Sequence, residues 1–360
     1  MKLGVAIYIK NHSFKWGYEY SDTLSADASS GSTSITVSNS SGLLKALKAG
    51  DRILIGPNSN YMQETKVIAS IDTSTSTIYF YSGLENDYES GDYIRGVGSA
   101  LAGAWTPNAN ATPQTISPSS RGYDDGYAQV ISLGNDTYPG NLRQYLDDDE
   151  IPPSSTLRLG FYYKLLGGNI WARVYDGSSS IISIDVSPQS DWTSISSTGS
   201  SGTGPSGSYV EFAHHSGTPV LTLDCVWLCH AVGTDGENQG YWEFTEYPDL
   251  GSVQWKTRSY FATQVLFDGT MRRYSKTGTG DKVRKYVFEC AFSNVSSSFW
   301  DNLVKFQEWC DKGRYLVFFP EIADLPPVLV GVMNILESDY KSHRMWDTNR
   351  KTFRFTFEEV

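Results

Sequence analysis

Apolar and polar residues alternate along much of this chain, with an apolar side chain at every second position. In TLRLGFYYK (residues 156–164) the apolar positions are Leu157, Leu159, Phe161 and Tyr163. In NIWARVYD (residues 169–176) they are Ile170, Ala172 and Val174. A period of two is that of a β-strand with one buried face. We predict two neighbouring strands here, with Gly167 and Gly168 between them as a hairpin turn.

Short strands that follow turn residues also fill the region from about residue 20 to 96. They are GSTSITV (31–37), AGDRILIG (49–56), STIYFYS (76–82) and SGDYIRGV (90–97). Gly, Asp or Ser opens each run, as is typical of a strand after a turn. The order Gly-Asp-x-Ile occurs twice, from Gly50 and from Gly91, and two turns of similar chemistry explain it. We predict a small β-barrel or β-sandwich.

The last region, from about residue 236 to 360, combines strands with one helix. Residues 298–312 have apolar residues at helical spacing, namely Phe299, Leu303, Phe306 and Cys310. Ser298 with Asp301 three residues later predicts a capping box at the start of this helix, and Gly313 predicts its end. The chain finishes on an alternating run with Phe353, Phe355 and Phe357 on one side. From these aromatic residues we expect the region to self-associate.

The predicted fold class is therefore mainly β, with several domains. A first strand (residues 1–19) precedes a small β domain (20–96), a β-sandwich (97–235) and a β-rich domain with one helix (236–360). We expect residues 5–9 to pair with a C-terminal strand, which would make the two middle domains insertions. Residues 196–208 are rich in Ser, Gly and Thr, and we expect a mobile surface loop that can be shortened without loss of stability.

Composition supports turn-rich β domains and excludes several classes of partner. Aromatic residues make up 14% and charged residues 19% of the chain, with 33 glycines. A net charge of −11 argues against a protein that binds nucleic-acid phosphates. No segment approaches the length of a transmembrane helix, and the first residues lack a signal-peptide pattern. We expect no nucleic-acid partner, no membrane insertion and four buried free thiols, at Cys225, Cys229, Cys290 and Cys310.

No group of residues indicates catalysis. LDDDEIPP (146–153) has four adjacent acids, which is typical of a solvated loop, whereas glycoside hydrolysis needs two carboxylates held apart. The chain has no phosphate-binding loop, dinucleotide motif or serine-hydrolase motif. We predict no enzyme activity, no catalytic residue and no metal site of recognised spacing. Calcium is the one cofactor left open, through the acids at Asp124, Asp125, 147–149 and Asp224.

The candidate binding residues lie on the polar side of the two alternating runs. They are Arg158, Tyr162, Lys164, Trp171, Arg173 and Tyr175. Exposed aromatic rings stack on the C–H patches of sugars, and flanking polar groups bond to sugar hydroxyls. The same residue types are enriched where a protein packs against another domain or subunit. The sequence leaves both interpretations open.

The region 97–235 resembles the jelly-roll carbohydrate-binding modules with the galactose-binding-like fold. The likeness depends on the order of GYDDGYAQVISLGN, LRQYL, STLRLGFYYKLLGGNIWARVYDG, DWTSI and YVEFAHHSGTPVLTLDCVWL. The residues that carry it are Gln144, Phe161, Tyr162, Tyr163, Trp192, Asp224 and Val226. The resemblance covers about 130 residues and implies a jelly-roll β-sandwich with a glycan-binding surface.

The C-terminal region resembles the distal-tail or baseplate proteins of long-tailed bacteriophages. The residues that carry the likeness are Asp268, Gly269, Trp300, Leu303, Phe306, Gly313, Phe318, Phe319, Pro320, Phe355 and Glu358. The resemblance implies a structural component of a phage tail tip that forms a homo-oligomeric ring. Its expected partners are its own copies, the tail tube and hub, and a host-surface glycan. Its expected location is the virion tail, after synthesis in the host cytoplasm.

Two other functions stay open from the sequence. One is a secreted or cell-surface glycan-binding protein with no role in a virion. The other is the accessory part of a glycoside hydrolase, which would need a carboxylate pair in a cleft.

Overall fold

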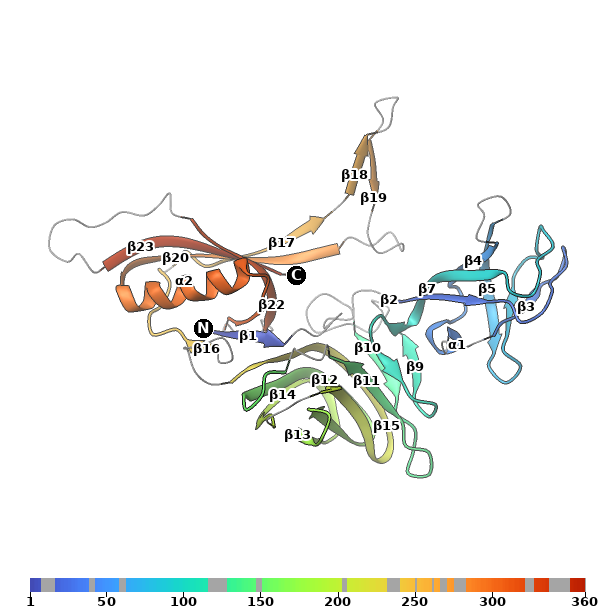
Figure 1. Cartoon of the computed structure of the whole chain (residues 1–360), viewed down its shortest axis with the longest axis horizontal. Helices are drawn as coiled ribbons and strands as arrows, with labels where there is room; N and C mark the ends of the chain where they lie inside the picture. The colour runs from blue at the N-terminus through green and yellow to red at the C-terminus, as the bar shows by residue number, and fades with distance from the viewer. Residues whose placement is uncertain are drawn as a thin grey trace.

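The computed structural model describes most of the chain. The described residues are 1–7, 17–38, 43–57, 63–115, 128–146, 151–202, 206–231, 240–249, 251–260, 262–265, 271–274, 283–320, 327–336 and 350–359. Strands dominate them, with one helix of a single turn and one longer helix in the described part (Figure 1). The predicted mainly β fold class is confirmed.

A closed β-barrel forms the part of the chain that follows the first strand. Its strands are β2 (Gly17–Thr23), β3 (Ser34–Thr36), β4 (Arg52–Gly56), β5 (Glu64–Asp72), β6 (Thr77–Phe80) and β7 (Tyr93–Ala102), and its helix is α1 (Leu43–Ala46). They pair in the order β2-β7-β4-β5-β6-β3, and a bridge between Leu24 and Val37 joins β3 back to β2. Strand β7 runs across the predicted boundary at residue 96.

The two Gly-Asp turns of the barrel have the same geometry. Gly50 and Gly91 have φ angles of +93° and +96°, a region that favours glycine. The carboxylate of Asp51 accepts a hydrogen bond from the backbone N–H of Lys48, and that of Asp92 accepts one from Glu89, both at 3.0 Å. Similar turn chemistry therefore accounts for the recurring sequence.

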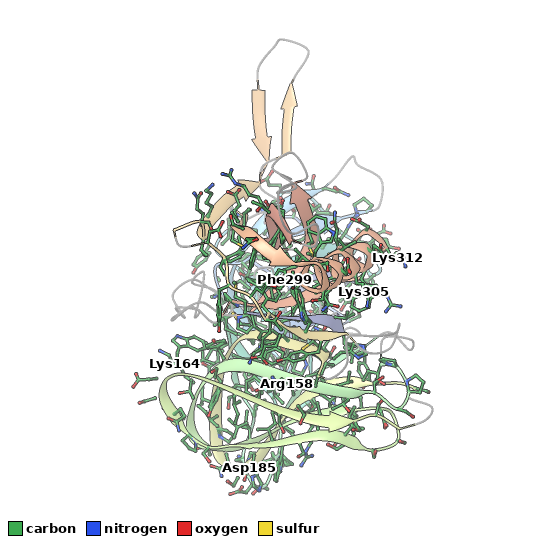
Figure 2. All side chains as sticks on the ribbon, turned by 90° about the vertical axis from the view of Figure 1, so that its left-hand side faces the viewer. Arg158, Lys164, Asp185, Phe299, Lys305 and Lys312 are labelled. Carbon is green, nitrogen blue, oxygen red and sulfur yellow. The ribbon has the colours of Figure 1, made fainter. Side chains whose placement is uncertain are left out.

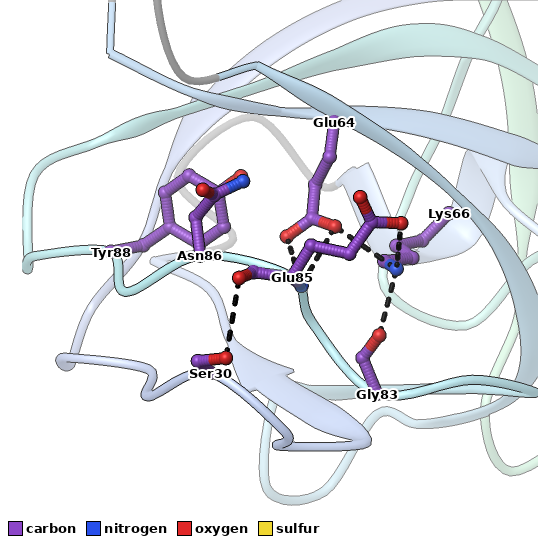
Figure 3. A network of polar contacts seen from close by, with 7 residues as sticks. All are labelled: Ser30, Glu64, Lys66, Gly83, Glu85, Asn86 and Tyr88. Atoms are coloured by element: carbon purple, nitrogen blue, oxygen red, sulfur yellow. Dashed lines mark hydrogen bonds and ion pairs between the residues drawn. The ribbon is translucent and has the colours of Figure 1, made fainter.

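A buried ion pair fixes the connection between β6 and β7 on the barrel rim (Figure 3). Lys66 Nζ lies 2.9 Å from Glu64 Oε2 and donates to the carbonyl of Gly83 at 2.7 Å. The Glu64 carboxylate also accepts the backbone N–H of Glu85 at 3.0 Å. Burial alone would raise the pKa of Glu64, but its bonds to Lys66 and Glu85 lower it. The pair therefore stays charged and holds this connection in place.

A β-sandwich follows the barrel. Its strands are β8 (Thr106–Pro107), β9 (Thr112–Thr115), β10 (Gln129–Ser132), β11 (Asn141–Tyr145), β12 (Thr156–Tyr175), β13 (Ser180–Val186), β14 (Gln189–Ser200) and β15 (Tyr209–His230). The first sheet contains β9, β10, the second half of β15, the first half of β12, and β14. The second sheet contains β8, β11, the first half of β15, the second half of β12, and β13. Phe161 and Phe212 meet edge to face between them, with centroids 4.9 Å apart.

The predicted hairpin at Gly167-Gly168 is wrong. Strand β12 runs through both glycines and stays paired with β15, with register shifts on either side of them. A side chain at Gly168 would overlap the carbonyl of Ser216, and one at Gly217 would lie 2.6 Å from the carbonyl of Gly167. The glycines therefore mark a bend at which two strands approach closely, and one continuous ribbon belongs to both sheets.

The predicted loop at residues 196–208 is also wrong over its first part. Residues 196–200 are the end of β14, which pairs with β12 from Thr156↔Ser200 to Leu165↔Gln189. Ser201 is buried and its hydroxyl donates to the carbonyl of Pro152 at 2.6 Å. Residues 203–205 lie outside the described part. This polar strand is tied to the sandwich by its backbone, so shortening it would remove sheet hydrogen bonds.

The C-terminal region is a sheet with one helix on its face (Figure 1). Its elements are β16 (Tyr241–Glu243), β17 (Gln254–Tyr260), β18 (Ala262–Val265), β19 (Met271–Tyr274), β20 (Val283–Ser296), α2 (Ser297–Asp311), β21 (Leu316–Phe319), β22 (Val328–Leu336) and β23 (Arg350–Glu359). The predicted face of α2, from Phe299 to Cys310, is buried as expected. Phe353, Phe355 and Phe357 are buried in the same core, so they offer no exposed surface for self-association.

The cap of α2 differs from the prediction. Ser296, not Ser298, is the N-cap, and its hydroxyl accepts the N–H of Phe299 at 3.3 Å. Asp301 does not complete a capping box, because Glu246 takes this role and accepts the N–H of Ser296 at 2.8 Å. At the other end Gly313 has φ +83° and its N–H bonds to the carbonyl of Cys310, as a terminating glycine does.

The first strand, β1 (Lys2–Ile7), joins the sandwich to the C-terminal sheet. One edge of β1 pairs with β21, with Val5 opposite Leu316. The other edge pairs with β16 and then with the end of β15, with Ala6 opposite Cys229. Residues 8 and 9, the end of the expected pairing segment, lie outside the described part. The limits of the domains stay a prediction.

A small apolar cluster packs across the same junction. Trp227 of β15 meets Phe319 of β21 edge to face at 4.9 Å, with Cys229 and Val317 buried beside them. Gly160 of β12 lies under the Trp227 ring, and a Cβ at this glycine would be 2.6 Å from Cε2 of the indole. The absence of a side chain at residue 160 therefore allows Trp227 to lie flat between the two sheets.

Gly160→Ala should displace Trp227 and weaken the junction. Forcing one methyl group into a packed site costs about 1–3 kcal/mol of the free energy of unfolding. Ser196→Ala is the matched control, because Ser196 is exposed on β14 directly opposite Gly160. Urea unfolding of the three proteins measures the difference. Equal midpoints for Gly160→Ala and the control would show that the indole has room to move.

Asp176, at the end of β12, is a buried carboxylate held by several donors. Its Oδ1 accepts the N–H groups of Ser178 and Ser179, each at 3.0 Å, and its Oδ2 accepts that of Gly202 at 2.9 Å. Burial alone would raise the pKa of Asp176, but these bonds lower it to about 2. The carboxylate thus connects the β12–β13 turn to the chain that leaves β14.

Asp176→Asn should lower stability at neutral pH and matter less in acid. Because the folded-state pKa is depressed, the stabilisation is present above pH 4 and is lost as the pH falls toward 2. A shift of this size corresponds to about 2 kcal/mol. Asp191→Asn, an exposed acid on β14, is the control. Urea unfolding at pH 6 and pH 2.5 should show the gap between wild type and Asp176→Asn closing at the lower pH; a constant gap would contradict this account.

Candidate functional site

The bend in β12 divides the predicted binding residues between two opposite surfaces. Arg158 lies on the outer face of the first sheet, with its guanidinium carbon 5.7 Å from the centre of the Tyr241 ring. Figure 2 shows Arg158 next to the C-terminal region and Asp185 on the far side of the sandwich. Tyr162 and Lys164 share the first sheet with Arg158, and Lys164 Nζ lies 5.3 Å from the Trp192 ring. The six residues therefore do not form one face.

Trp171, Arg173 and Tyr175 are together on the outer face of the second sheet. The strand register arranges this face in rows that cross the strands. The three rows are Tyr145–Tyr209–Tyr175, Arg143–Glu211–Arg173–Ser183 and Asn141–Ala213–Trp171–Asp185. We call these residues, with His215, the distal face. Asp185, which belongs to this face, lies on the side of the sandwich that is turned away from the C-terminal region (Figure 2).

The first row is a series of tyrosines. Tyr175 and Tyr209 stack with centroids 4.6 Å apart and an interplanar angle of 23°. Tyr145 lies 5.6 Å from Tyr209 at 59° and is 58% exposed. Burial raises the pKa of Tyr209, so its hydroxyl remains a hydrogen-bond donor at neutral pH. The row therefore presents ring edges and hydroxyl groups to the solvent.

The second row is charged. Arg143 Nε and Nη2 both lie 2.7 Å from Glu211 Oε1, and the Glu211 side chain is only 4% exposed. The guanidinium of Arg143 also lies over the Tyr209 ring, at 4.8 Å. Arg173 Nη1 donates to the Tyr175 hydroxyl at 3.2 Å. These contacts hold two guanidinium groups in fixed positions between the tyrosines and Trp171.

In the third row, the Trp171 ring lies between the side chains of Arg173 and His215. The guanidinium carbon of Arg173 lies 4.9 Å from the indole centre. The His215 imidazole lies 4.2 Å from it at an interplanar angle of 33°, and His215 Nδ1 is 3.1 Å from Asp185 Oδ1. His215 has this position because it is an extra residue in β15: Ile170 pairs with His214 and Asn169 with Ser216. Such a bulge redirects a side chain.

Sequence reasoning found only Trp171, Arg173 and Tyr175 among the twelve residues of the distal face. Tyr145 and Arg143 lie outward between the buried Leu142, Gln144 and Leu146, and Tyr209 and Glu211 lie outward beside Val210 and Phe212. The alternation in LRQYL and YVEFA therefore contains the signal. The register that brings these strands beside β12 is not readable from either segment alone.

No metal or redox centre emerges from the described residues. Within that part of the chain, no three His, Cys, Asp or Glu side chains form a group suited to a metal ion. Of the acids suggested for calcium, Asp224 is buried and accepts the N–H of Cys225 at 2.7 Å, while Asp124, Asp125 and 147–149 lie outside the described residues. The four cysteines are free and buried, as expected. No described helix is long and apolar enough to span a bilayer.

Comparisons with known proteins give only distant structural likeness. No family model matches the chain, and no curated protein matches it. It is similar over 36% of its length to the module of "CBM4 structure and function" (16% identity, 95% of that chain, TM-score 0.29). The same share matches the cellulose-binding domain of Cellulomonas fimi β-1,4-glucanase C (13% identity, 90% of that chain, TM-score 0.27). It also matches the enzymatically active domain of bacteriophage CBA120 tailspike protein 4 (15% identity, 19% of that chain, TM-score 0.29).

Carbohydrate-binding modules are thus among the structural neighbours. Identities and TM-scores this low assign neither a ligand nor a family. The two-sheet architecture is established by the strand register of the chain itself.

Proposed function

We propose that this chain is a non-catalytic structural protein of a phage tail tip or baseplate that presents a glycan-binding face. The observation that carries the glycan-binding part of the proposal is the distal face, with its tyrosine row, its two fixed guanidinium groups and Trp171. The face is carried on the side of the sandwich opposite the C-terminal region (Figure 2). This position leaves it available to a ligand outside the chain.

The spacing of the distal face suits an oligosaccharide. Trp171 and Tyr175 are four residues apart on one strand, which is roughly 13 Å. Between them lie guanidinium and hydroxyl groups, which are the hydrogen-bonding partners that sugar hydroxyls require. Aromatic rings at both ends supply apolar contact for C–H patches. A single sugar ring would engage only one of these rows.

Three alternative functions would use the same face differently. A secreted or cell-surface glycan-binding protein would need the face but no assembly, and the accessory part of a hydrolase would need a catalytic partner. A subunit interface would also use Tyr, Trp and Arg. On the distal face, the Glu211 carboxylate is already paired with Arg143, and the Asp185 carboxylate has His215 Nδ1 as a hydrogen-bond partner. Charges that are satisfied within one chain favour a neutral ligand over a charged protein surface.

Trp171→Ala should abolish or weaken glycan binding and leave the fold intact. Loss of a stacking contact worth about 1 kcal/mol weakens binding roughly fivefold. Ser196→Ala, an exposed substitution on β14 outside the distal face, should bind as wild type does. The measurement is a glycan array with the full-length proteins, together with thermal melts. A wild-type chain that binds no glycan would overturn the ligand proposal, and a large drop in melting temperature for Trp171→Ala would indicate a packing role.

The assembly part of the proposal is supported by the ribbon of β18 and β19. These strands pair with each other and with no other strand in the described part of the chain. Figure 1 shows them projecting from the body of the molecule. An isolated two-stranded ribbon is marginally stable in water, so contact with a partner would stabilise it.

We call residues 254–287 the arm, which comprises β17, this ribbon and the start of β20, and its charge favours a second copy as the partner. Residues 254–287 contain eight Lys or Arg and two Asp, a net charge of +6 in a chain of −11, so the remainder carries −17. Opposite charges attract copies of the chain to one another, and salt screens this attraction.

Charge reversal in the arm should weaken self-association. We expect the double variant Arg272→Glu and Arg273→Glu to shift sedimentation toward the monomer at low salt, as should high salt for the wild type. The control with the same charge change is Lys305→Glu with Lys312→Glu, because Lys305 is exposed on α2 and Lys312 is exposed at its C-cap. Analytical ultracentrifugation measures the distribution. Equal effects of the two double variants would contradict a role for the arm, and a wild type that stays monomeric at high concentration would contradict assembly by the protein alone.

A further inference from the structure

The stacking surfaces of Trp171 are covered by the chain itself. Arg173 lies two residues further along β12, and His215 lies on β15 in the other direction from the Trp171↔Ala213 pair. The register therefore places these two partners on opposite sides of the indole. A sugar ring that stacks on Trp171 must first displace one of them.

His215 is held less firmly than Arg173. Its side chain is 34% exposed, and its hydrogen-bond partner Asp185 is 48% exposed, so this contact lies at the surface. His215 is also the extra residue of a bulge, where the chain is not fixed by a regular ladder. Arg173, in contrast, is in a regular stretch of β12 and is bonded to the Tyr175 hydroxyl.

We propose that His215 is a movable cover on Trp171, tethered by Asp185, and that the indole accepts a neutral sugar ring when the imidazole swings away. This inference rests on the proposed glycan function of the distal face. His215 would then set affinity without being a stacking platform itself. The bulge in β15 would serve to position the His215 side chain over the indole.

If His215 covers Trp171, removal of its side chain should strengthen glycan binding. A ligand that binds only the open state has an apparent affinity reduced by the open fraction. If the open fraction is about one tenth, His215→Ala should tighten binding roughly tenfold. Asp185→Ala retains the imidazole and removes the side chain that holds it, so it should tighten binding by a smaller factor. Ser196→Ala, on β14 outside the distal face, should change neither exposure nor binding.

The test uses the full chain labelled with 5-fluorotryptophan, with the Trp171 resonance assigned by Trp171→Phe. The solvent isotope shift of that fluorine resonance reports exposure of the indole without any ligand. Titration with cellotetraose, a neutral oligosaccharide, then gives affinities for the wild type and the variants. Thermal melts confirm that each variant is folded.

Greater exposure of Trp171 in His215→Ala, with tighter cellotetraose binding, supports the cover. Unchanged exposure overturns it. Greater exposure with weaker or equal binding also overturns it, because His215 would then be part of the binding surface. If exposure rises but neither protein binds cellotetraose or any glycan on the array, the proposed glycan function fails, and the gating role fails with it.

Discussion

The close approach of β12 and β15 at their glycine bend determines how the rest of the molecule is arranged. At Gly167, Gly168 and Gly217 the two backbones leave no room for a side chain. Both strands therefore remain paired while they cross from one sheet of the sandwich to the other. Arg158, which faces outward before the bend, lies against Tyr241 of β16, and the outward side chains after the bend lie on the opposite surface. A single ribbon thus produces both the junction at Arg158 and the distal face at Trp171.

Strand β1 fixes the orientation of the sandwich relative to the C-terminal sheet. Its two edges pair with β21 on one side and with β16 and β15 on the other, so the sandwich and the C-terminal sheet share a continuous set of backbone hydrogen bonds. The edge-to-face contact of Trp227 with Phe319 fills the space next to β1. A flexible linker would let the distal face point in many directions, whereas a shared strand fixes it relative to the C-terminal sheet.

Patterns that depend on burial could be predicted from the sequence, and those that depend on tertiary partners could not. The alternation in residues 156–164 and the apolar stripe of α2 are confirmed because burial follows directly from period. The glycine pair at 167–168 predicts a hairpin but forms a strand bend, because both require the same freedom of the backbone. Residues 196–200 were misread because an edge strand needs only backbone pairing, which Ser and Thr supply as well as Val. The N-cap moved to Ser296 because the acid that completes it, Glu246, comes from another part of the chain.

The candidate site also depends on strand pairings that the sequence does not reveal. The outward positions on each strand were readable, but the site depends on the register between β11, β15, β12 and β13, and one extra residue in β15 decides that His215 lies on Trp171. The resulting stacks hold the rings and guanidinium groups in place before any ligand arrives. Such order reduces the entropy lost on binding. It also occupies the flat ring surfaces, so a ligand must either bond to the exposed edges and hydroxyls or displace a stacked neighbour. Affinity at this face therefore depends as much on how firmly the protein's own contacts hold as on the contacts that the ligand adds.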